Sequence, residues 1–190
     1  MKGKQAFSLQ CSVSGNAATA TPATEQGTRS TLTFRNRQRD RRLSLPFLRR
    51  VLRRVLTEQL PATTHDLCFH FVAAEEMARV NWQFLKHEGS TDVITFDYGE
   101  RSAVSGQRSA GLSGEAFICV ADAVKQAREF KTSWQGEVVR YAVHAVLHLR
   151  GYDDLQPAKR RVMKREENRL MRELAKRFDF QELEKKQARG

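Results

Sequence analysis

The sequence predicts a single domain in which helices pack around one small β-sheet. The chain has 190 residues, enough for one hydrophobic core and too few for two comfortable ones. Its hydrophobic content is 40%, and no apolar run is long enough to cross a bilayer. Segments in which apolar residues alternate with polar ones interleave with segments in which they recur at helical spacing. We therefore expect strands and helices to follow one another around one sheet.

The two ends of the chain differ in composition from its middle. Residues 1–29 are rich in Ser, Thr, Ala and Gly, contain one acid, Glu25, and show no periodicity, so we expect a disordered tail. An organelle transit peptide has a similar composition, but this segment is short of arginine and shows no clear amphipathic helix. The domain is expected over residues 30–180. The polar residues 181–190 are expected to form a frayed C-terminal tail.

Four segments have the features of strands. They cover residues 30–37, 65–72, 92–98 and 114–121. The second shows the pattern best, because alternate positions carry large apolar side chains that would share one face of a sheet. A Gly- and Ser-rich stretch over residues 99–113 separates the last two strands. It is expected to connect them, although such a loop could also close over a substrate.

Five helices are expected between and after these strands. The first follows Ser44, which can cap it, and has Pro46 in its first turn. The others are expected over residues 73–86, 122–131, 134–150 and 157–177. In the first helix Arg49, Arg50, Arg53 and Arg54 lie opposite the apolar stripe, with no acid among them. A solvated face is the usual reason for such a run, yet four like charges in two turns make contact with RNA phosphates an equal alternative.

Charge and cysteine content limit the class of partner and compartment. The formal net charge is +11 and the pI is about 10.1, which favours a polyanionic partner. RNA, DNA and an anionic membrane would all satisfy that charge. Cys11, Cys68 and Cys119 are few, odd in number and far apart, with no CxxC pair. This pattern argues against a disulfide scaffold or a cysteine zinc cluster and fits a reducing cytoplasm.

The most informative stretch is the one from His144 to Asp154. His144 and His148 stand four residues apart in an apolar run, so a helix would project both imidazoles from one face. Gly151 can close that helix in the left-handed conformation, and the chain would then bring Asp153 and Asp154 toward the histidines. Two imidazoles and a carboxylate are the ligands of a hydrolytic zinc site.

Two other interpretations of this stretch fit the residues less well. Two core histidines bonded to backbone carbonyls would explain an isolated HxxxH, but here Gly and two acids follow within one turn. In the HExxH motif of zinc peptidases, the residue after the first histidine is a glutamate that acts as general base. Here that residue is Ala145, so a peptidase of that mechanism is not expected.

The stretch HAVLHLRGYDD resembles the H-G-x-L-H-L-x-G-Y-D-H signature of the YbeY family, metal-dependent endoribonucleases of ribosomal RNA maturation. Three further stretches resemble that family in the same order, over about residues 30 to 177. They are NWQFLKHEGSTDVITF (residues 81–96), GEAFIC (residues 114–119) and the pair Met163 and Glu167, which falls where the family has M-x-x-x-E.

The resemblance implies an α+β domain with a small mixed sheet and a central metal-bearing helix, similar in outline to zincin folds. It implies that His144, His148 and Asp154 are the metal ligands and the catalytic centre, since Asp154 aligns with the family's third histidine. Asp153 would then orient an imidazole from outside the ligand set. One zinc ion per chain is expected, although a carboxylate in place of an imidazole favours harder ions such as Mn²⁺ or Mg²⁺.

The implied activity is single-strand-specific cleavage in ribosomal RNA maturation, at the 3′ end of 16S rRNA, and in ribosome quality control. The implied partners are ribosomal RNA, the small ribosomal subunit and a ribosomal protein, in the cytoplasm and away from membranes. One departure weakens the implied cleavage, because Leu85 stands where the family has an arginine implicated in activity. A ribosome-assembly factor that binds RNA without cutting it is therefore the alternative. A metallohydrolase with another substrate is a weaker one.

Overall fold

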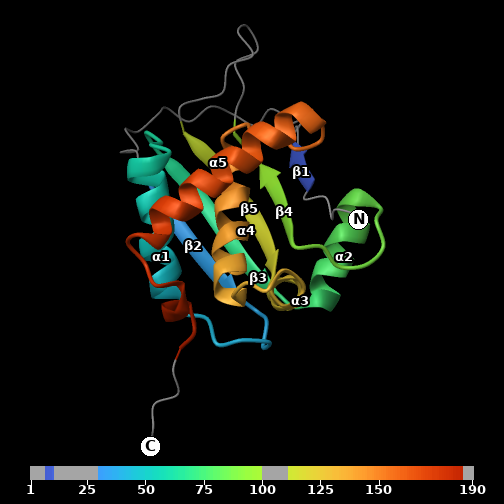
Figure 1. The fold of residues 1–190 in the computed structure, drawn as a ribbon. Helices are drawn as coiled ribbons and strands as arrows, with labels where there is room; N and C mark the ends of the chain where they lie inside the picture. Colours follow the sequence, from blue (N-terminus) through green and yellow to red (C-terminus); the bar gives the residue numbers. More distant parts are fainter. Residues whose placement is uncertain (1–6, 11–29, 100–110, 186–190) are drawn as a thin grey trace, which may run out of the picture.

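The computed structural model describes residues 7–10, 30–99 and 111–185, and its elements follow one another as strands and helices around one sheet (Figure 1). The strands are β1 (Phe7–Gln10), β2 (Thr31–Asn36), β3 (His65–Val72), β4 (Val93–Asp97) and β5 (Leu112–Cys119). The helices are α1 (Leu45–Arg54), α2 (Ala74–Leu85), α3 (Val120–Phe130), α4 (Trp134–Leu149) and α5 (Pro157–Ala175). A π-helical segment η1 (Val55–Gln59) extends α1, and a 3-10 turn η2 (Phe180–Leu183) follows α5.

The sheet is mixed, with the strand order β1-β4-β5-β3-β2. Neighbouring strands are parallel except for β4 and β5, which are antiparallel. The predicted α+β class, with a small mixed sheet and packed helices, is therefore confirmed. Part of the loop expected over residues 99–113 lies outside the described residues.

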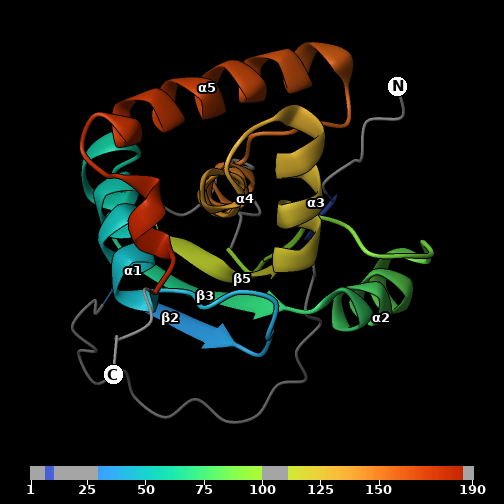
Figure 2. The same cartoon turned by 60° about the horizontal axis from the view of Figure 1, so that its bottom comes forward.

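Two clusters of apolar side chains cover the two faces of the sheet. The larger one joins Leu67, Phe69 and Phe71 of β3 to α1, α3, α4 and α5. The smaller one joins Val72, Ile94, Phe96 and Cys119 to Met77 of α2. Figure 2 shows the resulting layers, with α4 between the sheet and α5. Because α4 is covered on both sides, its side chains are buried on nearly every face.

Both chain ends differ from the predictions. Residues Phe7–Gln10, expected within a disordered tail over 1–29, instead pair in parallel with β4 and form an edge strand of the sheet. The rest of that tail lies outside the described residues. The expected frayed tail over 181–190 is wrong for its first five residues, because Leu183 is fully buried and Glu184 forms a bridge with Leu43. Among the described residues, no helix combines the length and apolar character needed to span a bilayer.

Candidate metal centre

The helix α4 places both histidines on one face. It begins after Ser133, whose side-chain oxygen accepts a hydrogen bond from the Gly136 N–H at 3.1 Å, and it runs without interruption to Leu149. The chain then turns at Gly151, which has φ of +91° as expected for a glycine closing a helix. This turn carries the following residues back along the helix, so that Asp154 faces the two rings.

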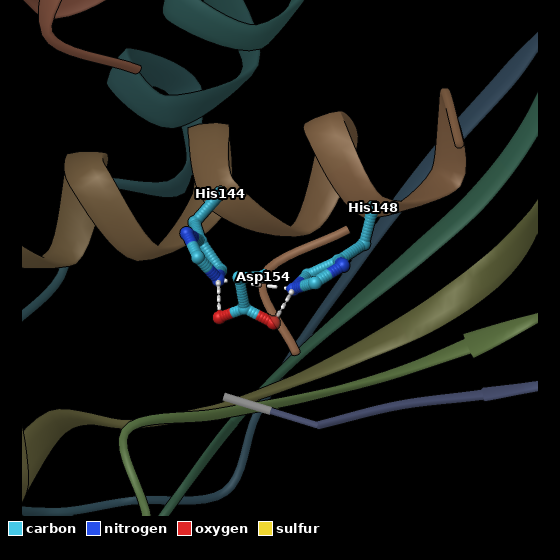
Figure 3. Close-up of side chains that lie close together, drawn as sticks. All are labelled: His144, His148 and Asp154. Carbon is cyan, nitrogen blue, oxygen red and sulfur yellow. Dashed lines mark hydrogen bonds and ion pairs between the residues drawn. The ribbon is translucent and has the colours of Figure 1, made fainter. Parts of the chain in front are cut away.

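His144, His148 and Asp154 converge on one point (Figure 3). The Nε2 atoms of the two histidines are 3.0 Å apart, and each lies 3.8 Å from a carboxylate oxygen of Asp154. One donor atom from each residue lies within 4.8 Å of the others. The structure thus brings together the three side chains that the sequence predicted as ligands.

The spacing of these atoms fits a divalent ion. Tetrahedral ligands about 2.0–2.2 Å from zinc lie roughly 3.4 Å from one another, between the 3.0 and 3.8 Å distances found here. Two imidazole nitrogens and one carboxylate oxygen also leave a fourth position of such an ion for water or substrate. The donor set and its geometry therefore suit one metal ion.

The other ring nitrogens determine which tautomer each histidine adopts. Nδ1 of His144 lies 2.9 Å from Oε2 of Glu167, and Nδ1 of His148 lies 3.2 Å from the carbonyl oxygen of Tyr152. A carboxylate and a carbonyl can only accept, so both Nδ1 atoms donate. In the neutral rings, both Nε2 lone pairs then point toward the shared position. Two lone pairs so close repel unless a cation or a proton lies between them, which is the arrangement that a metal ion requires.

The burial of His148 keeps its ring in the form that binds a metal. Its pKa is lowered to about 4 by burial and by the neighbouring His144, against a weaker opposing effect of the hydrogen bond to Tyr152. The ring is therefore neutral at neutral pH. Burial also raises the pKa of Asp154, whereas the charge of His144 acts in the opposite direction.

A buried carboxylate on α5 supports the first histidine. Glu167 is 3% exposed, and its Oε1 accepts hydrogen bonds from Arg140 at 2.6 Å and Lys164 at 2.7 Å. Burial alone would raise the pKa of Glu167, but the hydrogen bond from His144 and the charge of Lys164 lower it to about 2. Sequence reasoning found Glu167 within the M-x-x-x-E pattern without giving it a role.

The expectation that Asp153 orients an imidazole is wrong. Its Oδ1 accepts the backbone N–H of Leu155 at 2.9 Å, and its Oδ2 pairs with Lys159 at 3.1 Å. Its carboxylate instead fixes the turn that leads into α5, which leaves Glu167 and the Tyr152 carbonyl to hold the two rings.

The arginines predicted to contact RNA lie on α1, and three of them have partners within the protein. Arg50 pairs with Glu182 at 2.7 Å, Arg54 pairs with Glu58, and the Arg49 guanidinium lies 5.2 Å from the centre of the Phe34 ring. Arg53 is exposed. Their contact with RNA stays a prediction.

Comparison with known proteins shows the family to which the chain belongs. The family model described as Endoribonuclease YbeY matches residues 33–175. The chain belongs to the YbeY family. The resemblance expected from the sequence motifs is thereby confirmed over most of the domain.

Two curated YbeY proteins illustrate the similarity. The Endoribonuclease YbeY of Salinibacter ruber is 35% identical over 132 residues, which cover 69% of this chain and 83% of that protein. The Endoribonuclease YbeY of Parabacteroides distasonis is 33% identical over 118 residues, which cover 62% of this chain and 78% of that protein. A solution structure of TM1509 from Thermotoga maritima matches with a TM-score of 0.48 and 21% identity, over 74% of this chain and 88% of that one.

One position at which this chain departs from the YbeY pattern lies at the end of α2. Leu85 is half-buried and packs against the small cluster that contains Val72, Met77 and Ile94. The next residue, Lys86, ends the helix in the left-handed conformation with φ of +58°. The side chain at position 85 therefore has a packing role here that a cation would not fill in the same way.

Proposed function

We propose that this protein is a metal-dependent endoribonuclease that cleaves single-stranded RNA during ribosomal RNA maturation, including the 3′ end of 16S rRNA, and in ribosome quality control. The observation that carries the proposal is the convergence of His144, His148 and Asp154 in a chain of the YbeY family. The relatives named above bear the name endoribonuclease, which supports RNA as the substrate. The positive net charge of +11 suits such a polyanion.

In this proposal His144, His148 and Asp154 hold one zinc ion, or Mn²⁺ or Mg²⁺ because one ligand is a carboxylate. A bound divalent ion would supply Lewis-acid chemistry, polarising the scissile phosphodiester and making an attacking water more acidic. Glu167 and the Tyr152 carbonyl keep the Nε2 lone pairs of both histidines directed at the ion. Asp154 contributes negative charge that favours retention of the ion.

The proposed partners follow from the substrate. They are ribosomal RNA and the small ribosomal subunit, with a ribosomal protein in contact, in the cytoplasm. The arginines Arg49, Arg50, Arg53 and Arg54 are proposed to touch the RNA backbone away from the metal ligands.

The proposal is tested by cleavage of a labelled single-stranded RNA by the full chain, first with a chelator and then with Zn²⁺ or Mn²⁺ restored. We expect cleavage only with metal, and none with the His144→Ala variant. The His87→Ala variant is the matched control, because His87 is exposed and does not belong to the cluster. Cleavage that persists in the chelator, or in His144→Ala, would rule the proposal out.

The alternative, an assembly factor that binds RNA without cutting it, rests on Leu85. It predicts that wild type shows no cleavage, that Leu85→Arg gains it, and that His144→Ala still repairs ribosomal RNA processing in a deletion strain. Our proposal predicts cleavage by wild type and no repair by His144→Ala.

A further inference from the structure

The basic residues of α5, together with Lys176 directly after it, fall into two groups with different surroundings. Members of the first group each have a partner within the protein. The contacts of this group are Lys159 with Asp153 at 3.1 Å, Arg160 with the Asp154 carbonyl at 2.8 Å, Lys164 with Glu167 at 2.7 Å, Arg169 with Glu166 at 2.6 Å and Lys176 with Glu173 at 2.7 Å. All three acids of α5 are used in these pairs.

Arg161, Arg165 and Arg172 form the second group, which we call the α5 crest. Their spacing of four and seven residues places them on one face of the helix. That face lies opposite the buried stripe of Met163, Glu167, Leu170, Met171 and Leu174. All three arginines are exposed, and within residues 7–10, 30–99 and 111–185 no ion pair involves them.

The crest adjoins the loop that carries the metal ligand. Arg161 lies in the second turn of α5, seven residues after Asp154, and the nearby Lys159 and Arg160 bond directly to Asp153 and to the Asp154 carbonyl. The eleven helical steps from Arg161 to Arg172 span about 16 Å of helix. In Figure 2, α5 forms the layer farthest from the sheet, so its outer face is open along this length.

We propose that the α5 crest binds the phosphodiester backbone of the single-stranded RNA substrate. This inference rests on the proposed function, because it takes RNA as the substrate. Guanidinium groups form paired hydrogen bonds with phosphate oxygens, and uncompensated positive charges gain affinity by releasing counterions from the RNA. The crest suits this role better than α1, where three of the four arginines already contact side chains of the protein.

The test measures the affinity of the full chain for a labelled single-stranded RNA by fluorescence anisotropy, with a chelator present so that the RNA stays intact. The crest variant carries Arg161→Gln, Arg165→Gln and Arg172→Gln. The matched control carries Arg79→Gln on α2 and Lys125→Gln and Arg128→Gln on α3, exposed residues outside the proposed RNA contacts, and removes the same charge. A third variant carries Arg161→Lys, Arg165→Lys and Arg172→Lys, which keep the positive charge. Thermal melts of the variants report whether each is folded.

We expect the crest glutamine variant to bind RNA at least about tenfold more weakly at physiological salt. The slope of log affinity against log salt concentration should be shallower by about 2. The α2 and α3 control should lose less than about threefold, and the lysine variant should bind nearly as wild type does. Unchanged binding by the crest glutamine variant, or an equal loss in the α2 and α3 control, would overturn the inference while leaving the proposed function intact. Absence of RNA binding by wild type would overturn both.

Discussion

Nδ1 of His144 donates to Oε2 of Glu167 at 2.9 Å, joining α4 to α5 across 23 residues of sequence. Arg140 and Lys164 hold the same carboxylate from two other directions. The ring of His144 is therefore fixed by α5 as well as by its own helix. A group that fixes the ring and its tautomer should influence metal affinity without touching the ion.

The variant Glu167→Gln should weaken metal binding about tenfold to a hundredfold, because a neutral amide holds the Nδ1–H less strongly than a carboxylate does. The measurement is a competition titration of Zn²⁺ against a chromophoric chelator. Glu166→Gln is the control, since Glu166 pairs with Arg169. If both variants bound zinc as wild type does, Glu167 would have no role in positioning His144.

The metal-free protein should lose stability as the pH falls below about 6.5. The pKa of His148 is about 4 in the folded chain and about 6.5 when unfolded, so the unfolded state takes up the proton first. The free energy of unfolding should therefore be level above pH 7 and decline from pH 6.5 toward pH 4. Denaturant titrations at several pH values, with a chelator present, measure this.

The variant His148→Gln is the control for the pH dependence, because glutamine does not titrate. Its stability should change less between pH 6.5 and pH 5 than that of wild type, a range above the pKa of ordinary carboxylates. An equal decline in both proteins would show that another group is responsible.

The variant Gly114→Ala should destabilise the fold where β5 packs against the end of α4. A Cβ at this position would come 2.6 Å from Cδ2 of Leu149 and into contact with the carbonyl oxygen of Phe96. Close packing of β5 against β4 and α4 thus requires glycine, and we expect a loss of about 1–3 kcal/mol in urea unfolding. Ser113→Ala, at the neighbouring position whose side chain points away from this contact, should change stability by less than about 0.5 kcal/mol. Equal effects of the two substitutions would contradict this explanation.

The variant Leu183→Ala should cost about 2–5 kcal/mol, because Leu183 is fully buried in the main core. Leu155→Ala makes the same change at a side chain that is 61% exposed and should have little effect. Thermal melts of both variants measure the difference. A Leu183→Ala protein as stable as wild type would mean that the chain around Leu183 frays, as the sequence predicted.

The helices and central strands could be predicted because their apolar residues recur with the period of each element. The edge strand Phe7–Gln10 could not, since its order depends on pairing with β4, far away in sequence. Leu183 was missed for a related reason. A single apolar residue in a polar tail has no periodicity, and its burial depends on where α1 and α4 have left room.

The shared face of His144 and His148 could be predicted from spacing alone, because residues four apart on a helix lie on one face. Spacing did not separate Asp153 from Asp154, and only the family resemblance favoured the second. The structure explains the difference through the turn, in which Asp153 bonds to Leu155 and Lys159 while Asp154 faces the rings. The role of Glu167 could not be found from the chain order, because it depends on how α5 crosses α4.

The central claim is that His144, His148 and Asp154 together bind one divalent ion. The most direct test is the metal content of the purified wild-type, Asp154→Ala and Asp153→Ala proteins by mass spectrometry, after each has been loaded with Zn²⁺ and desalted. We expect one ion per chain in wild type and in Asp153→Ala, and a large loss in Asp154→Ala. A wild type without bound metal, or an Asp154→Ala protein as fully loaded as wild type, would contradict the claim.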